Sequence, residues 1–192
     1  MNRQITLLVA CLCCALANNS SAAGWVEADF SYYNPDWELR ESESGLRLSA
    51  AYTNAAWSFV ATHNSIATQR VNQDVVRLRG LPFSNWNEIW VSRSVGLSDS
   101  LALEFSATYQ SLNLQGETRS GGGAAVGLNS NWSDRWRTQL RISNFTLEEN
   151  DWRITGELAY RAQTDAELIL RIDDFDEFDF TWYEIGYRFY LR

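Results

Sequence analysis

The chain has 192 residues, enough for one domain of ordinary size. Its 16 basic residues are all Arg, against 24 acidic residues, and the resulting net charge of −8 argues against nucleic-acid binding. The three cysteines, Cys11, Cys13 and Cys14, all lie near the N-terminus. The remainder of the chain can therefore form neither a disulfide nor a cysteine-based zinc site.

The first 23 residues have the composition of a secretory signal peptide. Arg3 precedes an apolar run over residues 5–17, and small residues follow as far as Ala23. A transmembrane helix needs about 20 apolar residues, which this run lacks. A lipoprotein-type attachment at Cys11 would leave an apolar run of only a few residues. We expect cleavage after Ala23, with Ala17 as the alternative, and a single domain over residues 24–192.

Beyond this segment, the chain alternates between apolar and polar side chains. Alternation with period two is typical of β-strands whose two faces meet different surroundings. In the last such segment, for example, Tyr183 and Ile185 share one face, and Glu184 and Arg188 share the other. Ten segments show the pattern: residues 25–33, 44–52, 57–68, 85–97, 101–112, 123–132, 136–147, 151–161, 166–174 and 181–192.

The connections between these segments alternate in kind. Turns of three or four residues follow the even-numbered segments up to the eighth, whereas the others include the longer stretches 34–43, 69–84 and 112–122. An even number of strands with short turns at one end and longer loops at the other is typical of outer-membrane barrels. We therefore predict an all-β fold, a transmembrane antiparallel up-and-down β-barrel of about ten strands, with eight as the alternative. Both termini then lie at the short-turn end, in the periplasm.

The aromatic residues support a membrane position. Many fall near the ends of the predicted strands, where Trp and Tyr rings form belts at membrane interfaces. A soluble barrel would instead bury its aromatic residues in mid-strand. The predicted interface aromatics are Trp25, Trp57, Trp132, Trp136, Trp152, Tyr160 and Phe189, with Phe145 and Phe175 assigned to the belt at the long-loop end.

The charged residues fall on the predicted lumen face. Leaving out the fourth strand, whose Ile89-Trp90-Val91 run hides its register, seven Arg face seven acids, so the surplus acid belongs to loops and turns. Because ten strands enclose little more space than eight, we expect these charges to fill the lumen as ion pairs rather than to line an open channel. The predicted lumen network comprises Glu27, Asp29, Arg47, Glu104, Arg137, Arg141, Arg153, Glu157, Arg161, Glu167, Arg171, Asp173, Glu184 and Arg188.

Three short motifs suggest other chemistry. The acidic stretch with Asp174, Asp176 and Glu177 could offer oxygen ligands to Ca²⁺, but it lacks the glycine-punctuated spacing of a calcium loop and is expected to be a solvated rim. The small residues from Ser120 to Ala124 lack the Lys of a phosphate loop and are expected to lead a loop into the sixth strand. His63 and Ser65 lie on one face of the third strand.

The terminal strand and the whole predicted domain resemble the small bacterial outer-membrane β-barrel proteins, the porin-like or OmpA/OmpX-like group. That group ends in alternating hydrophobic residues with a final aromatic, which the barrel-insertion machinery recognises. Here Leu191 occupies the last hydrophobic position, and Arg192 extends beyond it. The resemblance implies a monomer in the outer membrane, in contact with lipid and lipopolysaccharide, without a cofactor.

Three functions remain open at this stage. The first is a non-enzymatic barrel with a structural, surface-interaction or narrow-pore role. The second follows from His63-x-Ser65, which resembles the His-x-Ser of the outer-membrane lipid A deacylases. That resemblance implies Ser65 as nucleophile, His63 as base and a Glu on a neighbouring strand as the third member. The third is a soluble periplasmic barrel that binds an apolar ligand.

Overall fold

In the computed structural model of the chain, ten antiparallel strands close into a barrel. Each strand pairs with its neighbours in sequence, and β1 pairs with β10 to complete the ring. The strands are β1 (Ala22–Pro35), β2 (Glu43–Asn54), β3 (Trp57–Ile66), β4 (Phe83–Ser98), β5 (Leu101–Leu114), β6 (Glu117–Asn131), β7 (Trp136–Thr146), β8 (Asn150–Gln163), β9 (Ala166–Phe175) and β10 (Phe180–Leu191). The structure describes residues 22–35, 43–54, 56–66, 83–114, 117–147, 150–176 and 180–191.

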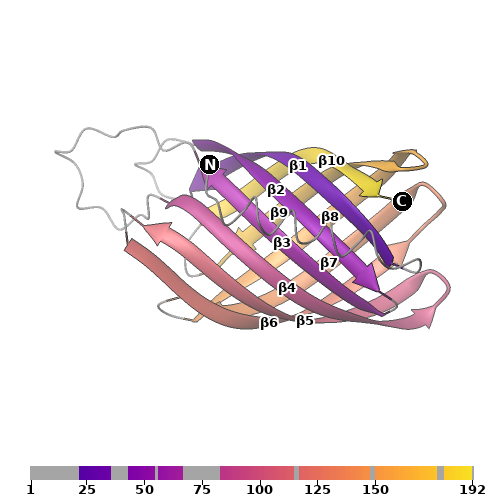
Figure 1. The fold of residues 1–192 in the computed structure, drawn as a ribbon, viewed down its shortest axis with the longest axis horizontal. Helices are drawn as coiled ribbons and strands as arrows, with labels where there is room; N and C mark the ends of the chain where they lie inside the picture. The colour runs from indigo at the N-terminus through magenta and orange to yellow at the C-terminus, as the bar shows by residue number, and fades with distance from the viewer. Residues whose placement is uncertain are drawn as a thin grey trace.

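The strands run between the two ends of the barrel at a tilt to its long axis, as Figure 1 shows. The short turns, including the one between β2 and β3, lie at the end where β10 finishes, on the right of the figure. We call this the short-turn end, and we call the opposite end the loop end. No helix among the described residues is long and apolar enough to span a membrane.

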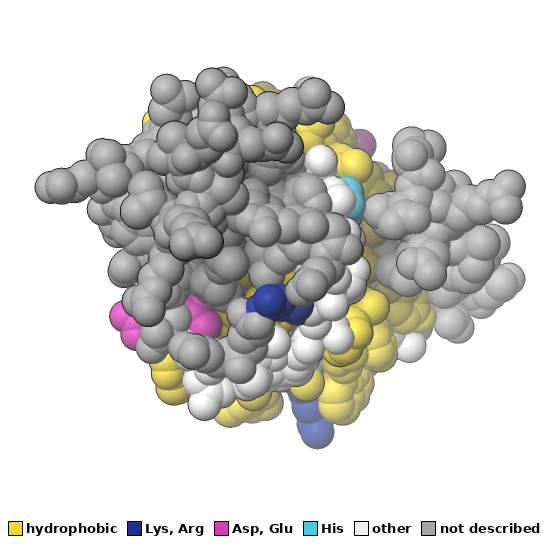
Figure 2. Space-filling view, turned by 90° about the vertical axis from the view of Figure 1, so that its left-hand side faces the viewer, with side chains coloured by type: hydrophobic (Ala, Val, Ile, Leu, Met, Phe, Trp, Pro, Cys, Tyr) yellow, Lys and Arg dark blue, Asp and Glu magenta, His cyan; other side chains and the backbone are white. Residues whose placement is uncertain are grey.

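The two faces of the barrel wall differ as the alternation predicts. Outward-facing residues such as Leu48, Ile142 and Ile185 are apolar and about half exposed, at 47–50%. Inward-facing residues such as Glu27 and Arg171 are at most 5% exposed. Figure 2, a view onto the loop end, shows hydrophobic side chains along the outer wall. An apolar exterior around a charged interior is the arrangement of a transmembrane barrel, so the predicted fold is confirmed and the eight-stranded alternative is wrong.

The structure shows which side chains of β4 face the lumen, a question that the sequence left open. Trp86, Glu88, Trp90 and Ser92 face the lumen and are buried, whereas Ile89 faces outward and is 43% exposed. The strand contains irregularities in its pairing with β5, between Phe83 and Asn85 and between Gly96 and Ser98. Glu88 is therefore a lumen carboxylate that the sequence count omitted.

The fifth and sixth strands are longer than predicted. β5 continues to Leu114 and β6 begins at Glu117, so the stretch 112–122, expected to be a loop, lies almost wholly in strand. The glycines belong to the sheet because β6 and β7 approach closely: a Cβ on Gly123 would lie 2.4 Å from the backbone oxygen of Asn144. Glycine inside a strand often marks such a close backbone approach. The expectation that Ser120–Ala124 form a loop entrance is wrong.

The N-terminal boundary of the domain stays a prediction. Residues 1–21, which include most of the expected signal peptide and all three cysteines, lie outside the described residues. β1 begins at Ala22, and Ala22 and Ala23 pair with Asn54 and Thr53 of β2.

Gly186 offers a test of how β10 closes against β1. Its Cβ position lies 1.8 Å from Asp29 Oδ1 and 2.4 Å from the backbone oxygen of Ala28, so a methyl group there requires a backbone shift. We expect Gly186→Ala to lower the free energy of unfolding by about 1–3 kcal/mol, the usual cost of overpacking. Urea titration of the detergent-folded protein measures this change. Gly156→Ala is the control because nothing lies within 4 Å of its Cβ position, and equal effects of the two variants would contradict the explanation.

Candidate functional site

The centre of the lumen is organised around Arg171 of β9. Its Nη2 atom lies 2.6 Å from Glu27 and 2.7 Å from Glu157, and its Nη1 atom lies 2.7 Å from Glu184 and 3.2 Å from Asp29. These carboxylates come from β1, β8 and β10, and the Arg171 side chain is 5% exposed. A planar guanidinium with several fixed donors suits this position, since a Lys could not direct its hydrogen bonds in the same way.

A second arginine extends the network towards the short-turn end. Arg188 of β10 donates from Nε to Glu27 at 2.6 Å and from Nη1 and Nη2 to Glu157 at 3.1 Å. Its guanidinium also lies 4.4 Å from the centre of the Trp25 ring. Arg137 of β7 then links Glu157 to Glu167, at 3.1 Å from each. The ion pairs thus cross the seam between β1 and β10 and continue around the wall to β7.

Two separate ion pairs join β8 to β4 and β7 to β5. Arg153 Nη2 lies 2.8 Å from Glu88 Oε1, with both side chains at most 3% exposed. Arg141 Nη2 lies 2.8 Å from Glu104 Oε1, and its guanidinium lies 4.9 Å from the Trp90 ring centre. Such contacts between guanidinium groups and ring faces are favourable cation–π interactions, strengthened where water is excluded.

At the loop end, hydrophobic side chains fill the lumen. The Trp86 ring lies 5.8 Å from Phe145, 5.2 Å from Phe175 and 5.4 Å from Trp182, measured between ring centres. All four are at most 3% exposed, and Tyr33 and Leu112 complete the group. We call these six residues the aromatic cluster. They come from β1, β4, β5, β7, β9 and β10, so the cluster is built from most of the circumference of the barrel.

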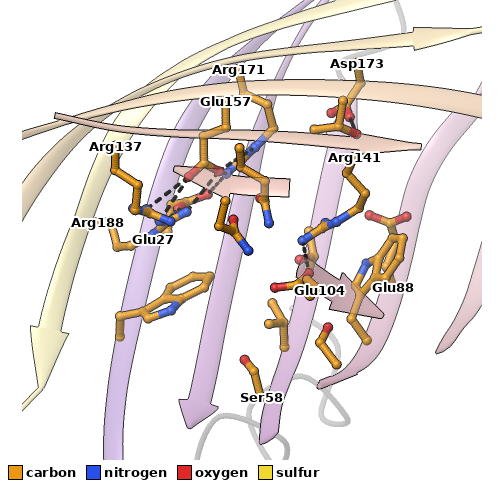
Figure 3. A pocket seen from close by; sticks show the side chains of 18 of the residues that line it. Glu27, Ser58, Glu88, Glu104, Arg137, Arg141, Glu157, Arg171, Asp173 and Arg188 are labelled. Carbon is orange, nitrogen blue, oxygen red and sulfur yellow. Dashed lines mark hydrogen bonds and ion pairs between the residues drawn. The ribbon is translucent and has the colours of Figure 1, made fainter. Parts of the chain in front are cut away.

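Arg153 forms the boundary between the two halves of the lumen. Its guanidinium lies within 6 Å of the ring centres of Trp86, Phe145 and Phe175 as well as of Trp90. On its other side, a cavity of about 250 Å³ extends to Thr53, Ser58 and other residues near the short turns. Figure 3 shows this cavity with Glu27, Arg137 and Arg188 on one side and Arg141, Glu104 and Glu88 on the other. The charged residues that line it are Glu27, Arg47, Glu88, Glu104, Arg137, Arg141, Arg153, Glu157, Arg171, Asp173 and Arg188.

The structure places the predicted lumen residues as follows. All except Arg161 point into the lumen with limited exposure; the Arg161 side chain is 49% exposed and lies 3.6 Å from Glu167 at the rim. Arg47 lies 2.9 Å from Glu184, and Thr155 donates a hydrogen bond to Asp173. The sequence reasoning missed Glu88 because the register of β4 was unreadable, and it missed the buried Asp151 at the start of β8.

Three residues assigned to the interface belts lie inside the barrel instead. Trp25 packs under Arg188, and Phe145 and Phe175 belong to the aromatic cluster. The assignment used their position near strand ends and neglected their parity, since Trp25 shares a face with Glu27, and Phe145 shares one with Arg141. Trp57, Trp132, Trp136, Trp152 and Phe189 are 41–68% exposed, and the Tyr160 ring lies tilted against Trp136 with ring centres 4.7 Å apart.

The residues considered for catalysis and for calcium binding lie on the outer wall and at the loop end, as far as the structure describes them. His63 and Ser65 face outward on β3, and His63 Nδ1 lies 2.7 Å from Asn87 Oδ1 of β4. Among the described residues, no group of three or more His, Cys, Asp or Glu could hold a metal ion. Asp174 and Asp176 are exposed at the loop end, and Glu177 lies outside the described residues.

Comparisons with known proteins find similar structures only. No protein-family model and no curated protein matches the chain. Among solved structures, the KdgM porin has a TM-score of 0.49 at 10% identity over 86% of this chain and 99% of that one. The NanC porin has a TM-score of 0.49 at 9% identity over 85% and 98%, respectively. An outer-membrane channel from Pseudomonas putida F1 has a TM-score of 0.49 at 9% identity over 90% and 97%. At these levels, the similarities assign neither a function nor a ligand to this chain.

Arg171 allows the importance of the lumen network to be measured. Replacing it with Met keeps most of the side-chain volume but leaves Glu27, Glu157 and Glu184 without their shared cation. We expect a loss of about 3–5 kcal/mol in the free energy of unfolding, the usual cost of breaking a buried ion pair. Arg161→Met is the control, with an expected loss below about 1 kcal/mol because its ion pair is exposed. Urea unfolding followed by tryptophan fluorescence measures both, and an equally small effect of the two substitutions would contradict a structural role for the network.

Proposed function

We propose that this chain is an integral outer-membrane barrel whose lumen stabilises the wall and forms no open channel. In this proposal, any activity or recognition belongs to the surfaces that meet lipid and the exterior. The observation that carries it is the aromatic cluster, which fills the lumen at the loop end, next to the ion pairs of Arg153 and Arg171.

The membrane position is supported by the outer surface. Leu48, Phe105, Ile154 and Ile185 are about half exposed, and such residues recur on every side of the barrel. Exposed apolar area on this scale would make a water-soluble protein aggregate, whereas lipid covers it at no cost. Strands of 10–16 residues also suffice for a tilted crossing, which needs about 9–11.

The polar interior argues against the soluble, ligand-binding alternative. A barrel that carries an apolar ligand needs an apolar cavity, and the cavity of about 250 Å³ is lined by charged residues such as Arg137, Arg141 and Glu104. Six hydrophobic interior residues are packed into the aromatic cluster, and Trp25, Val60 and Trp90 are a minority among the residues that line the cavity.

The orientation and partners follow from the membrane position. Barrels of this kind keep their short turns in the periplasm, so the last residues of β10 and the first residues of β1 lie on that side in this proposal. Outer-membrane phospholipid and lipopolysaccharide then cover the apolar wall. The barrel-insertion machinery is the partner during assembly, with the alternating residues Tyr183 to Phe189 as its recognition element, and the mature barrel is a monomer without cofactor.

Single-channel recording tests whether the lumen is closed. We expect the wild-type protein in a planar lipid bilayer to show no resolved openings, because the packed rings of Trp86, Phe145, Phe175 and Trp182 occupy the lumen at the loop end. The double variant Trp86→Ala/Phe145→Ala removes two of these rings and should conduct. Trp152→Ala/Tyr183→Ala, which removes two outward-facing aromatic rings near the same end, should stay closed. Steady conductance by the wild-type protein would contradict the proposal.

A charge placed on the outer wall tests the membrane position. Ile185 lies in the middle of β10 and faces outward, so Ile185→Arg should cost about 2–4 kcal/mol when the protein folds into lipid vesicles. Thr146→Arg, at the loop end of β7, should cost about 0–1 kcal/mol because the group lies near the interface. Equal tolerance of the two substitutions in vesicles would argue against lipid contact at Ile185.

A further inference from the structure

One arginine interrupts the apolar outer wall near the short-turn end. Ser92 of β4 faces the lumen and is buried, so the next side chain, Arg93, lies on the outward face, where it is exposed. The other arginines of the described strands belong to the lumen side, including Arg161 at the rim and Arg119, the register partner of the buried Leu112. Arg93 is therefore the single arginine that these strands direct towards lipid.

The surrounding wall supplies no carboxylate to this arginine. β3 contains no acidic residue, and the acidic residues of β4 and β5, Glu88 and Glu104, face the lumen and pair with Arg153 and Arg141. Within the described part of the chain, the Arg93 side chain forms no ion pair or hydrogen bond. A guanidinium beside hydrocarbon is costly unless a polar group satisfies it. Its counter-ion therefore has to come from outside the protein.

Arg93 lies at the level where lipid headgroups begin. It pairs in register with Trp57, the first residue of β3, and the backbone amide of Ser94 donates to the backbone oxygen of Ala56 in the β2–β3 turn at 2.9 Å. Trp57 is 46% exposed, and the Arg93 guanidinium lies 5.6 Å from the centre of one of its rings. Tryptophan residues in such positions mark the membrane interface. The positive charge is thus held beside an interfacial ring, where a long side chain can extend to the headgroup phosphates.

Apolar residues continue from Arg93 towards the middle of the wall. Val91 and Ile89 follow on the same face of β4, and Ile89 is 43% exposed. Phe59 of β3 is the register partner of Val91, and Phe105 of β5 is the register partner of Arg93. Both rings are exposed, at 41% and 50%. An acyl chain that lies along β4 between these rings therefore has its phosphate end at Arg93.

We propose that Arg93 and Trp57 bind the phosphate of a phospholipid in the leaflet around the short-turn end, with a preference for an anionic headgroup. A guanidinium donates two parallel hydrogen bonds to phosphate oxygens, and the indole N–H of Trp57 is a further donor at the same level. The described parts of β3, β4 and β5 direct no carboxylate outward that would receive the ammonium of a zwitterionic headgroup. Phosphatidylglycerol therefore fits this site better than phosphatidylethanolamine. The proposal rests on the membrane position proposed above and is independent of the state of the lumen.

A second exposed arginine at the same end of the barrel provides a matched comparison. Arg135 lies in the turn between β6 and β7, next in sequence to Asp134, and its Nη1 atom donates to the Tyr160 hydroxyl at 3.5 Å. It therefore lies outside the apolar wall, and both a hydroxyl group and an acidic neighbour are close to it. General attraction between arginine and anionic lipid would involve both residues equally, whereas the proposed site involves Arg93 alone.

The test uses the full-length protein folded in detergent that contains equal amounts of phosphatidylglycerol and phosphatidylethanolamine. Native mass spectrometry measures which lipid stays bound, and we expect retention of phosphatidylglycerol. Arg93→Gln should weaken this binding at least about tenfold, the effect of losing one charge-assisted hydrogen bond. Arg93→Lys should have a smaller effect, because it keeps the charge but lacks the planar pair of donors. Arg135→Gln is the control and should change binding by less than about twofold, because exposed charges contribute little.

Further measurements separate lipid binding from its alternatives. The heat-dependent gel shift of every variant confirms a folded barrel. Added inorganic phosphate should leave the bound phosphatidylglycerol in place, because the acyl chains also contribute to binding; displacement would show that Arg93 takes free phosphate and would overturn the proposal. Equal retention of the two lipids by the folded wild-type protein, or equal losses in Arg93→Gln and Arg135→Gln, would overturn it as well. Failure of the wild-type protein to fold into phospholipid vesicles would instead contradict the membrane position itself.

Discussion

The hydrogen bonds of Arg171 hold the two ends of the sheet together where the barrel closes. One guanidinium contacts carboxylates on β1, β8 and β10, so it joins the first strand of the chain to the last two hairpins. Closing β1 against β10 brings together residues more than 140 positions apart, and loop-closure entropy opposes that step. The seam also gathers several carboxylates in a small space, which only shared cations make tolerable. Closing β1 against β10 and neutralising these carboxylates therefore occur together, through Arg171 and Arg188.

Aromatic packing and ion pairs fill different parts of the lumen, and a cavity occupies a third part. Towards the loop end, aromatic rings pack as they would in the core of a water-soluble protein; in the middle, arginines and carboxylates satisfy each other; towards the short-turn end, a cavity remains. Arg153 joins the first two regions, because its charge pairs with Glu88 while its planar group lies among rings. Hydrophobic packing excludes water from one side of the ion pairs and so strengthens them. The combination explains how ten strands enclose an interior with little open volume.

The sequence predicted the strands well because period-two alternation is a local signal, and the lumen parity followed from it for residues such as Glu27 and Arg188. It failed where the signal was absent or was overridden by another cue. The run Ile89-Trp90-Val91 is apolar on both faces, so Glu88 could not be assigned. The glycines before Ala124 suggested a loop, yet Gly121 and Gly123 allow a close approach to β7, which only the paired strand reveals. Trp25, Phe145 and Phe175 carried the correct parity, but their position near strand ends suggested an interface. The contact between His63 and Asn87 joins two strands separated by a long connection, and no pattern within either strand predicts it.

The lumen face and the lipid face of the wall are subject to different constraints, so substitutions on the two faces have different effects. Inside, the charges around Arg171 are held by several partners, so a substitution there changes stability before it changes anything else. Outside, lipid contact demands only apolar side chains, and a polar group is retained against a cost unless another polar group satisfies it. His63 and Asn87 satisfy each other through the contact between Nδ1 and Oδ1. The polar side chains beside them continue onto β5 as Ser111 and Asn113, so outward-facing polar residues gather at the loop end of these strands, where the wall approaches the membrane interface.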